Sequence, residues 1–102
     1  MVEWLAMPAT GAAPVMLDAW SEAFAALGQT ARIVHDGPGV AWIEVPSARL
    51  RGYAVIEGGG VEAINFELRE PDPAAALALL QAVVAKLGWE LHQEDDEEDD
   101  SP

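Results

Sequence analysis

VEAINFELR, the stretch at residues 61–69, decides the fold class because its side chains alternate in character. The apolar positions are Ile64, Phe66 and Leu68, and the positions between them hold Ala63, Asn65 and Glu67. Successive side chains of a β-strand point to opposite faces of its sheet. The stretch therefore predicts a strand in an antiparallel sheet that packs against a core on one side only.

Three further strands are expected just before this stretch. Residues 30–35, 40–45 and 50–57 are rich in β-branched or aromatic side chains. The segments between these strands contain glycine and proline, which are typical of turns. Four strands joined in order by short turns most simply form an antiparallel meander. Residues 2–7 and 89–93 are candidates for additional short strands.

Two helices are expected, one on each side of the meander. The first spans roughly residues 14–27, where apolar side chains recur at helical spacing and Gly28 fits the C-terminal cap. The second spans residues 73–87, with Asp72 as its cap and Pro73 in its first turn. Its surface is apolar on more than one side, which favours contacts beyond a single core.

The expected fold is therefore α+β. We predict a sheet of four to five mostly antiparallel strands, with one helix before the meander and one after it, both packed on one face. Residues 1–93 are expected to form this single domain, because 102 residues support only one core.

Residues 94–102 are expected to form a disordered acidic tail. The chain carries 18 acidic and 5 basic side chains, for a formal net charge of −13. Seven of the acidic side chains are consecutive: Glu94, Asp95, Asp96, Glu97, Glu98, Asp99 and Asp100. Such a block repels itself and contributes nothing apolar to a core. The scarcity of cations argues against binding to nucleic acid or to an anionic membrane surface.

Several other functional classes are excluded or disfavoured by composition. The chain has no cysteine, which excludes disulfides, thiol catalysis and thiolate metal sites. No run of apolar residues approaches the roughly 20 needed to cross a bilayer, and no basic residue precedes Arg32. We therefore expect a cytoplasmic protein.

No catalytic or cofactor motif is recognisable. The three glycines at 58–60 precede a strand and lack the lysine of a phosphate-binding loop. His35 and His92 have no nucleophile in a recognisable context, and His92 with Glu90 provides only two of the ligands that a metal site requires. We therefore expect no enzyme activity, no cofactor and no metal site.

The leading functional hypothesis is a non-enzymatic protein-interaction module of the chaperone, inhibitor or adaptor kind, acting as a homodimer. Leu79 and Val83 of the second helix and the acidic residues 94–100 are the predicted partner-binding residues, with a basic protein as the partner. The acidic tail has two other readings, as a mimic of nucleic acid or as a solubilising segment.

The alternative hypothesis is a small-ligand-binding domain or an accessory enzyme subunit. Its ligand would occupy a cleft between helix and sheet lined by Trp20, Trp42, Tyr53 and Phe66, with Asn65 as a polar contact.

Overall fold

The computed structural model describes residues 2–9, 11, 15–58, 60–69 and 73–94 of the chain. The strands are β1 (Val2–Pro8), β2 (Arg32–His35), β3 (Val40–Val45), β4 (Leu50–Glu57), β5 (Gly60–Leu68) and β6 (Trp89–Glu94). The helices are α1 (Leu17–Ala26), the short 3-10 turn η1 (Pro46–Ala48) and α2 (Pro73–Leu87). This arrangement confirms the predicted α+β class with an antiparallel sheet.

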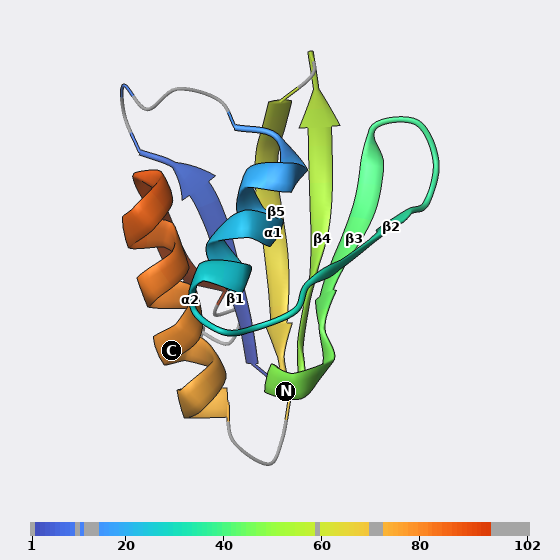
Figure 1. The fold of residues 1–102 in the computed structure, drawn as a ribbon. Helices are drawn as coiled ribbons and strands as arrows, with labels where there is room; N and C mark the ends of the chain where they lie inside the picture. The colour runs from blue at the N-terminus through green and yellow to red at the C-terminus, as the bar shows by residue number, and fades with distance from the viewer. Residues whose placement is uncertain (1, 10, 12–14, 59, 70–72, 95–102) are drawn as a thin grey trace, which may run out of the picture.

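The sheet has six strands, rather than the four to five that we predicted, in the order β2-β3-β4-β5-β1-β6. Strands β2 to β5 form the expected meander, and every neighbouring pair is antiparallel. β1 inserts between β5 and β6, so the first and last strands in sequence extend the sheet on one side. Figure 1 shows β1 on the side of β5 away from β4. The strand count was underestimated because β1 and β6 are paired by contacts that are distant in sequence.

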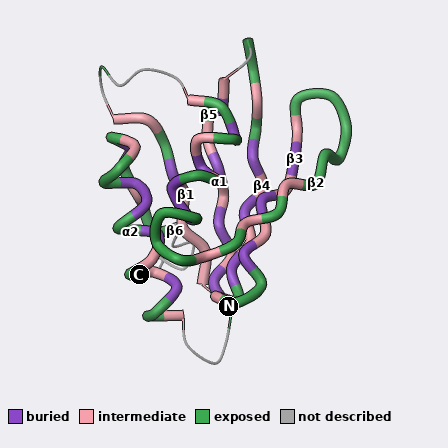
Figure 2. The backbone as a smooth tube through the Cα atoms, in the orientation of Figure 1, coloured by how far each residue is buried: buried purple, intermediate pink, exposed green. Residues whose placement is uncertain are grey.

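One face of the sheet carries the hydrophobic core. Alternate side chains of the central strands, such as Ile43, Ile64 and Phe66, have no exposed surface. Trp20 of α1 packs against Phe66 and meets Trp89 edge-on, with ring centroids 5.5 Å and 5.1 Å apart, respectively. Figure 2 shows these buried positions as purple bands that recur along the strands and helices. α1 and α2 lie against each other, and α2 also contacts β5 and β6.

A close approach between strands fixes the centre of this face. Gly52 of β4 stands opposite Phe66 of β5 and is buried. A Cβ atom at Gly52 would lie 2.5 Å from a methyl carbon of Ile64 and 2.7 Å from the ring of Phe66. Only glycine leaves room for the Phe66 ring at this position.

The first helix differs in detail from its sequence pattern, whereas the second has the predicted bounds. α1 begins at Leu17 and is shorter than predicted; Leu17 is buried, whereas Met16 is 58% exposed. Pro14 and Asp72, which we expected at the first turn and the cap of the two helices, lie outside the described residues. α2 spans the predicted residues 73–87.

Two further findings concern the termini. β6 continues through Glu94, one residue past the predicted end of the domain, and the rest of the predicted acidic tail, residues 95–102, lies outside the described residues. In the part of the chain that the structure describes, no helix is long and apolar enough to span a membrane.

Candidate functional site

The second face of the sheet, here called the open face, is the first candidate surface. Its side chains alternate along the strands with those of the core, and none of those described is buried. The strand register arranges them in three rows that run across the sheet. The charged row comprises Arg32, Glu44, Arg51, Glu67 and Glu3; the aromatic row comprises Val34, Trp42, Tyr53, Asn65, Leu5 and His92; the aliphatic row comprises Val40, Val55 and Ala63.

The charged row alternates in sign over its first four members. Arg32 donates hydrogen bonds from Nε and Nη2 to Oε1 of Glu44, at 3.1 Å and 2.7 Å. Arg51 Nε lies 3.3 Å from Oε1 of Glu67. Glu3 is opposite Glu67, which places two acidic residues side by side on β1 and β5. Positive charge therefore gathers toward β2 and β4, and negative charge toward β1.

The aromatic row contains a compact cluster at the centre of the open face. Trp42 and Tyr53 meet edge-on with their ring centroids 4.8 Å apart. The Arg51 guanidinium carbon lies 4.2 Å from the centroid of the Trp42 ring, within cation–π range. These contacts hold the three side chains in a fixed arrangement on a surface that nothing else in the described chain covers.

Asn65 is a polar member of the aromatic row, and its side-chain oxygen has no hydrogen-bond donor among the described residues. Its side-chain oxygen Oδ1 is inaccessible to solvent, yet it accepts no hydrogen bond from the described residues. An amide oxygen withdrawn from water without a partner costs free energy, so buried polar atoms are almost always paired. Tyr53 and Leu5 stand on either side of Asn65 in the register.

Apolar side chains surround this cluster. Val34, Val55 and Met7 are 42%, 39% and 40% exposed and lie on the open face by strand alternation. Isolated exposed apolar side chains are ordinary, but a group that flanks an aromatic pair forms a contiguous apolar surface.

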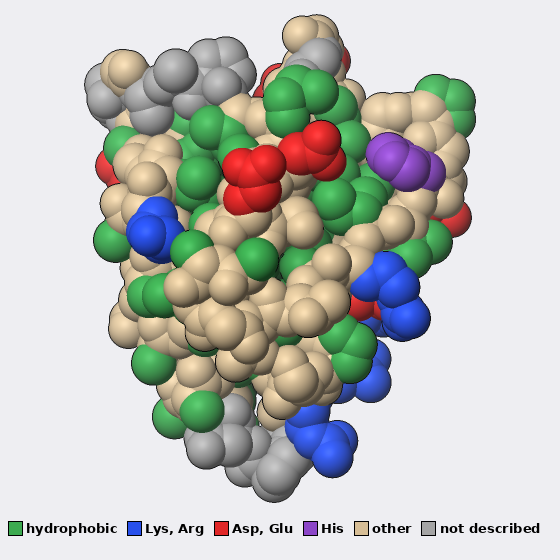
Figure 3. All heavy atoms as spheres, viewed as in Figure 1, with side chains coloured by type: hydrophobic (Ala, Val, Ile, Leu, Met, Phe, Trp, Pro, Cys, Tyr) green, Lys and Arg blue, Asp and Glu red, His purple; other side chains and the backbone are tan. Residues whose placement is uncertain are grey.

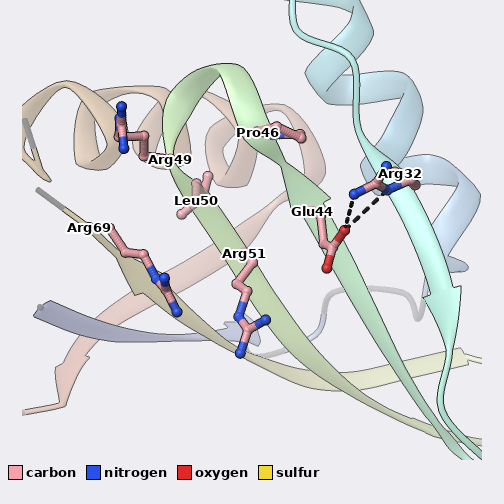
Figure 4. A pocket seen from close by; sticks show the side chains of 7 residues that line it. All are labelled: Arg32, Glu44, Pro46, Arg49, Leu50, Arg51 and Arg69. Carbon is pink, nitrogen blue, oxygen red and sulfur yellow. Dashed lines mark hydrogen bonds and ion pairs between the residues drawn. The ribbon is translucent and has the colours of Figure 1, made fainter.

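A second candidate, here called the arginine cluster, lies at one end of the same sheet. Arg32, Arg49, Arg51 and Arg69 line a pocket of about 240 Å³ together with Glu44, Pro46 and Leu50 (Figure 4). The arginines come from β2, from the residue that follows η1, from β4 and from the residue after β5. Figure 3 shows most of the blue Lys and Arg atoms along the lower right side of the molecule, with another blue side chain apart from them on the left.

Nearby carboxylates neutralise the arginines of the pocket only in part. Glu44 pairs with Arg32, while Oε1 of Glu67 is shared between Arg51, at 3.3 Å, and Arg69, at 3.7 Å. Arg49 forms no side-chain ion pair with the described residues. The pocket lining thus holds four arginines and one glutamate, and Glu67 contacts two of these arginines from outside the lining, which leaves a local excess of positive charge in a strongly acidic chain.

Arg49 is positioned by an unusual backbone. Its φ of 53° and ψ of 47° make it the one non-glycine residue with positive φ in the described chain. Its N–H donates to the carbonyl of Pro46, and its own carbonyl accepts from the N–H of Arg69. These two hydrogen bonds stabilise a left-handed backbone conformation that residues other than glycine rarely adopt.

The structure separates the residues that we predicted to form an aromatic cleft. Trp20 and Phe66 are fully buried in the core, whereas Trp42 and Tyr53 lie on the open face. Asn65, the predicted polar contact, lies with the second pair. The four aromatic residues therefore do not line one cavity between helix and sheet.

The two predicted partner-binding residues of α2 differ in their exposure to solvent. Leu79 is half-buried and lines a shallow pocket beside Arg49 and Ser47. Val83 has no exposed surface, because α2 packs a wide arc against α1 and the sheet. Val83 is a core residue and offers no surface to a partner. Of the acidic partner-binding residues, Glu94 belongs to β6, and Asp95, Asp96, Glu97, Glu98, Asp99 and Asp100 lie outside the described residues.

Titratable groups elsewhere add little to the site. Among the described residues, no group of three or more histidines and carboxylates is placed to hold a metal ion. His92 Nε2 lies 3.1 Å from Oε1 of Glu90. A hydrogen bond to Glu57 and repulsion from its charge raise the pKa of Glu62 above its ordinary value, with a small further contribution from desolvation.

Comparisons with known protein families, with curated proteins and with solved structures found no match to this chain.

Proposed function

We propose that this protein is a non-enzymatic interaction module that forms a homodimer through the open face of its sheet. The observation that carries the proposal is the aromatic and aliphatic surface that both helices leave uncovered. Monomeric proteins rarely expose contiguous apolar surface of this kind unless it contacts a partner.

The size of the open face fits a second copy of the chain. Six strands spaced about 4.8 Å apart give a width of about 24 Å, and the length of β3 is about 20 Å. The flat area is therefore about 500 Å², and protruding side chains increase the accessible area beyond that. Stable interfaces bury about 800 Å² on each partner, which is of the same order.

The distribution of charge favours a particular arrangement of the two copies. Arg32 and Arg51 lie on the half of the face formed by β2, β3 and β4, while Glu3 and Glu67 lie on the other half. A two-fold axis parallel to the strands, passing between β4 and β5, reverses the strand order in the second copy. The more positive half of one copy then faces the more negative half of the other. Such an isologous contact needs one self-complementary surface.

The same axis brings a polar group of each copy close to Asn65 of the other. Because Tyr53 and Asn65 flank the axis on β4 and β5, the Tyr53 hydroxyl of one copy faces the Asn65 side chain of the other. The hydroxyl forms a hydrogen bond with the Asn65 amide across the interface once that amide turns its oxygen, which is inaccessible to solvent in the single chain, toward the second copy. Two aligned sheets pack with their strand directions within about 30° of each other, which is compatible with this central contact.

Sedimentation of two matched variants tests the proposal. Tyr53→Glu places a charge at the centre of the open face and should convert dimers into monomers. Leu79→Glu places the same charge on α2 and should leave the dimer intact. Far-ultraviolet circular dichroism of each variant verifies that it is folded, and Val34→Glu provides a second, more exposed test position.

Two outcomes would overturn the assignment. A wild-type chain that sediments as a monomer at all concentrations would exclude homodimerisation. A Leu79→Glu monomer together with a Tyr53→Glu dimer would instead place the dimer interface on α2.

A further inference from the structure

The arginine cluster holds four of the five Lys and Arg residues of the chain in one pocket. The fifth, Lys86, lies in the last turn of α2. The four arginines come from separate segments of the chain, between Arg32 and Arg69, that the strand register brings together. Surface ion pairs need no such gathering, because each cation requires only one neighbouring carboxylate. The collection of nearly all cations in one pocket therefore points to an anion that they share.

The cluster keeps two positive charges after the neighbouring carboxylates are counted. Arg32 is compensated by its own glutamate at 2.7 Å. Arg51 and Arg69 share the single carboxylate of Glu67. Arg49 forms no side-chain ion pair with the described residues. A ligand with two negative charges would complete the charge balance of this pocket.

Two of the arginines approach one point on the sheet. Arg51 Nε and Arg69 Nη2 lie 3.3 Å and 3.7 Å from the same atom, Oε1 of Glu67. Charge-assisted hydrogen bonds of this kind are typically about 2.7–2.9 Å long, so Glu67 holds neither arginine closely. In Figure 4, the side chains of Arg51 and Arg69 extend from β4 and from the end of β5 toward the same side of the sheet. Because each guanidinium has several N–H donors, both side chains have donors available for a compact anion between them.

Arg49 borders the pocket just before the start of β4, and in Figure 4 its guanidinium is directed away from those of Arg51 and Arg69. The Arg49 side chain is exposed and forms no ion pair with the described residues, so it is free to turn toward a ligand. Its φ of 53° suits glycine, which would adopt this backbone conformation with less strain. Strained residues of this kind are found at ligand-binding positions. Arg49 is therefore placed to provide a third contact with the anion.

We infer that the arginine cluster binds the dianionic phosphate group of a small molecule. A phosphate monoester carries a charge of about −1.5 to −2 at pH 7, which matches the two positive charges that remain in the cluster. Its three terminal oxygens accept hydrogen bonds from several directions, whereas a carboxylate is planar and carries one charge. The pocket volume of about 240 Å³ lies below the range of about 300–1,000 Å³ that is usual for drug-sized ligands, which favours a small molecule.

A titration of the full chain with phenyl phosphate, followed by nuclear magnetic resonance, tests this inference. The arginine Nε–H signals of Arg51 and Arg69 should shift and saturate, while the amide signal of Lys86 stays in place. Phenyl sulfate has nearly the same shape but a single negative charge. At constant ionic strength near pH 7 it should bind about tenfold more weakly, because it leaves one guanidinium charge uncompensated. Binding of phenyl sulfate as tight as that of phenyl phosphate, or no saturable binding of either, would overturn the inference.

Inorganic phosphate identifies which part of the ligand the pocket recognises. An affinity equal to that of phenyl phosphate would show that the phosphate group alone is bound, as free phosphate would be. Tighter binding of phenyl phosphate would show that the pocket also contacts the organic group of an ester, through the apolar lining residues Pro46 and Leu50. Both results support a phosphate site, and they distinguish its two sources of ligand.

A charge-matched pair of variants tests whether the cluster itself binds the probe. Arg69→Gln removes one of the two converging guanidinium groups and should weaken phenyl phosphate binding about tenfold. Lys86→Gln makes the same change in net charge outside the pocket and should leave the affinity unchanged. Arg49→Gly should also weaken binding, yet it should not lower the melting temperature, because glycine adopts a positive φ without strain. Equal losses of affinity for Arg69→Gln and Lys86→Gln would overturn the assignment to the cluster.

A substitution with the opposite effect sharpens the test. Glu67→Gln removes the carboxylate that Arg51 and Arg69 share, so it should tighten phenyl phosphate binding. Glu22→Gln, on the exposed surface of α1, makes the same change in net charge and should have a much smaller effect. Equal gains from both variants would show that the overall charge of the chain, rather than this cluster, controls the affinity.

The phosphate site is independent of the proposed dimer, because Arg49 and Arg69 belong to none of the three rows of the open face. The titration is run at a protein concentration at which the chain sediments as a monomer. If the chain is monomeric at every concentration, the proposed dimer fails and the titration still tests the pocket. If dimers form at higher concentration but phenyl phosphate does not bind the monomer, the phosphate site fails and the dimer stands.

Discussion

The two faces of the sheet are built from the same strands, yet they differ in every property that matters for binding. On the covered face, Ile64 and Phe66 are fully buried beneath the helices, and Gly52 makes room for the Phe66 ring. On the open face, Tyr53 and Asn65 alternate with those residues and remain half-exposed. Because a strand presents successive side chains to opposite sides, one sequence encodes both a core and a surface. The covered face determines folding stability, and the open face is available for association.

The largest effect is expected when the aromatic ring of Phe66 is removed from the covered face. This substitution tests whether the covered face, rather than the open face, determines folding stability. Phe66→Ala leaves a cavity under α1, where the ring of Trp20 packs against it, and should lower the free energy of unfolding by about 3–5 kcal/mol. Urea unfolding followed by circular dichroism measures the change. The matched open-face substitution, Tyr53→Ala, should cost much less in the monomer, and equal losses for the two variants would contradict the division.

A smaller loss is expected when the covered face is overfilled. Gly52→Ala introduces a Cβ atom within 2.7 Å of the Phe66 ring, so the ring or the strand must shift. Overpacking of this kind typically costs about 1–3 kcal/mol. Thermal unfolding measures the effect, and Ala63→Gly, on the open face of β5, provides a comparison that removes a half-buried methyl group and adds backbone freedom without overfilling the core. If Gly52→Ala preserved the wild-type melting temperature, the tight packing of this face would be refuted.

The open face should respond more weakly in the monomer. Trp42→Ala removes both the edge-on contact with Tyr53 and the cation–π contact with Arg51. Each of these is worth about 0.5–1 kcal/mol at a half-exposed position. Unfolding at a protein concentration low enough to give monomers measures this loss. Repeating the measurement at high concentration should enlarge the loss if the open face binds a second copy.

The features of this fold that sequence could predict are local ones. The alternation in residues 61–69 and the helical pattern of residues 73–87 were sufficient to predict β5 and α2, because each depends on neighbouring side chains. The insertion of β1 between β5 and β6 was not predictable, because pairing of the two chain ends depends on contacts between distant residues. The resulting sheet is wider than expected.

The candidate sites were less predictable than the elements for the same reason. Arg49 and Arg69 both lie at or next to the ends of predicted strands. This placement is the only feature of the sequence that indicates that the two arginines line the same pocket. Their meeting requires the register in which Leu50 pairs with Leu68, which turn composition alone does not specify. Likewise, Trp42 and Phe66 were grouped in one cleft because aromatic character does not reveal which face a residue occupies.

The smallest expected effect concerns a pair of carboxyl groups in the hairpin of β4 and β5, away from the core. A hydrogen bond and charge repulsion from Glu57 raise the pKa of Glu62 above its ordinary value of 4.5. The folded state therefore holds the proton more tightly than the unfolded state does. The stabilisation from this proton is complete below pH 4.5 and is lost as pH rises through the higher pKa of the folded protein.

Glu62→Gln should consequently raise the melting temperature slightly at pH 7, because the repulsion between the two carboxylates disappears. The difference from the wild type should shrink as pH falls toward 4.5, where the wild-type side chain is itself protonated. Calorimetry across this pH range measures the trend. Glu22→Gln, on the exposed surface of α1, makes the same change in net charge and separates the local contact from the general acidity of the chain. An equal gain from both substitutions would show that overall charge, rather than the Glu57 contact, limits stability at this end of the sheet.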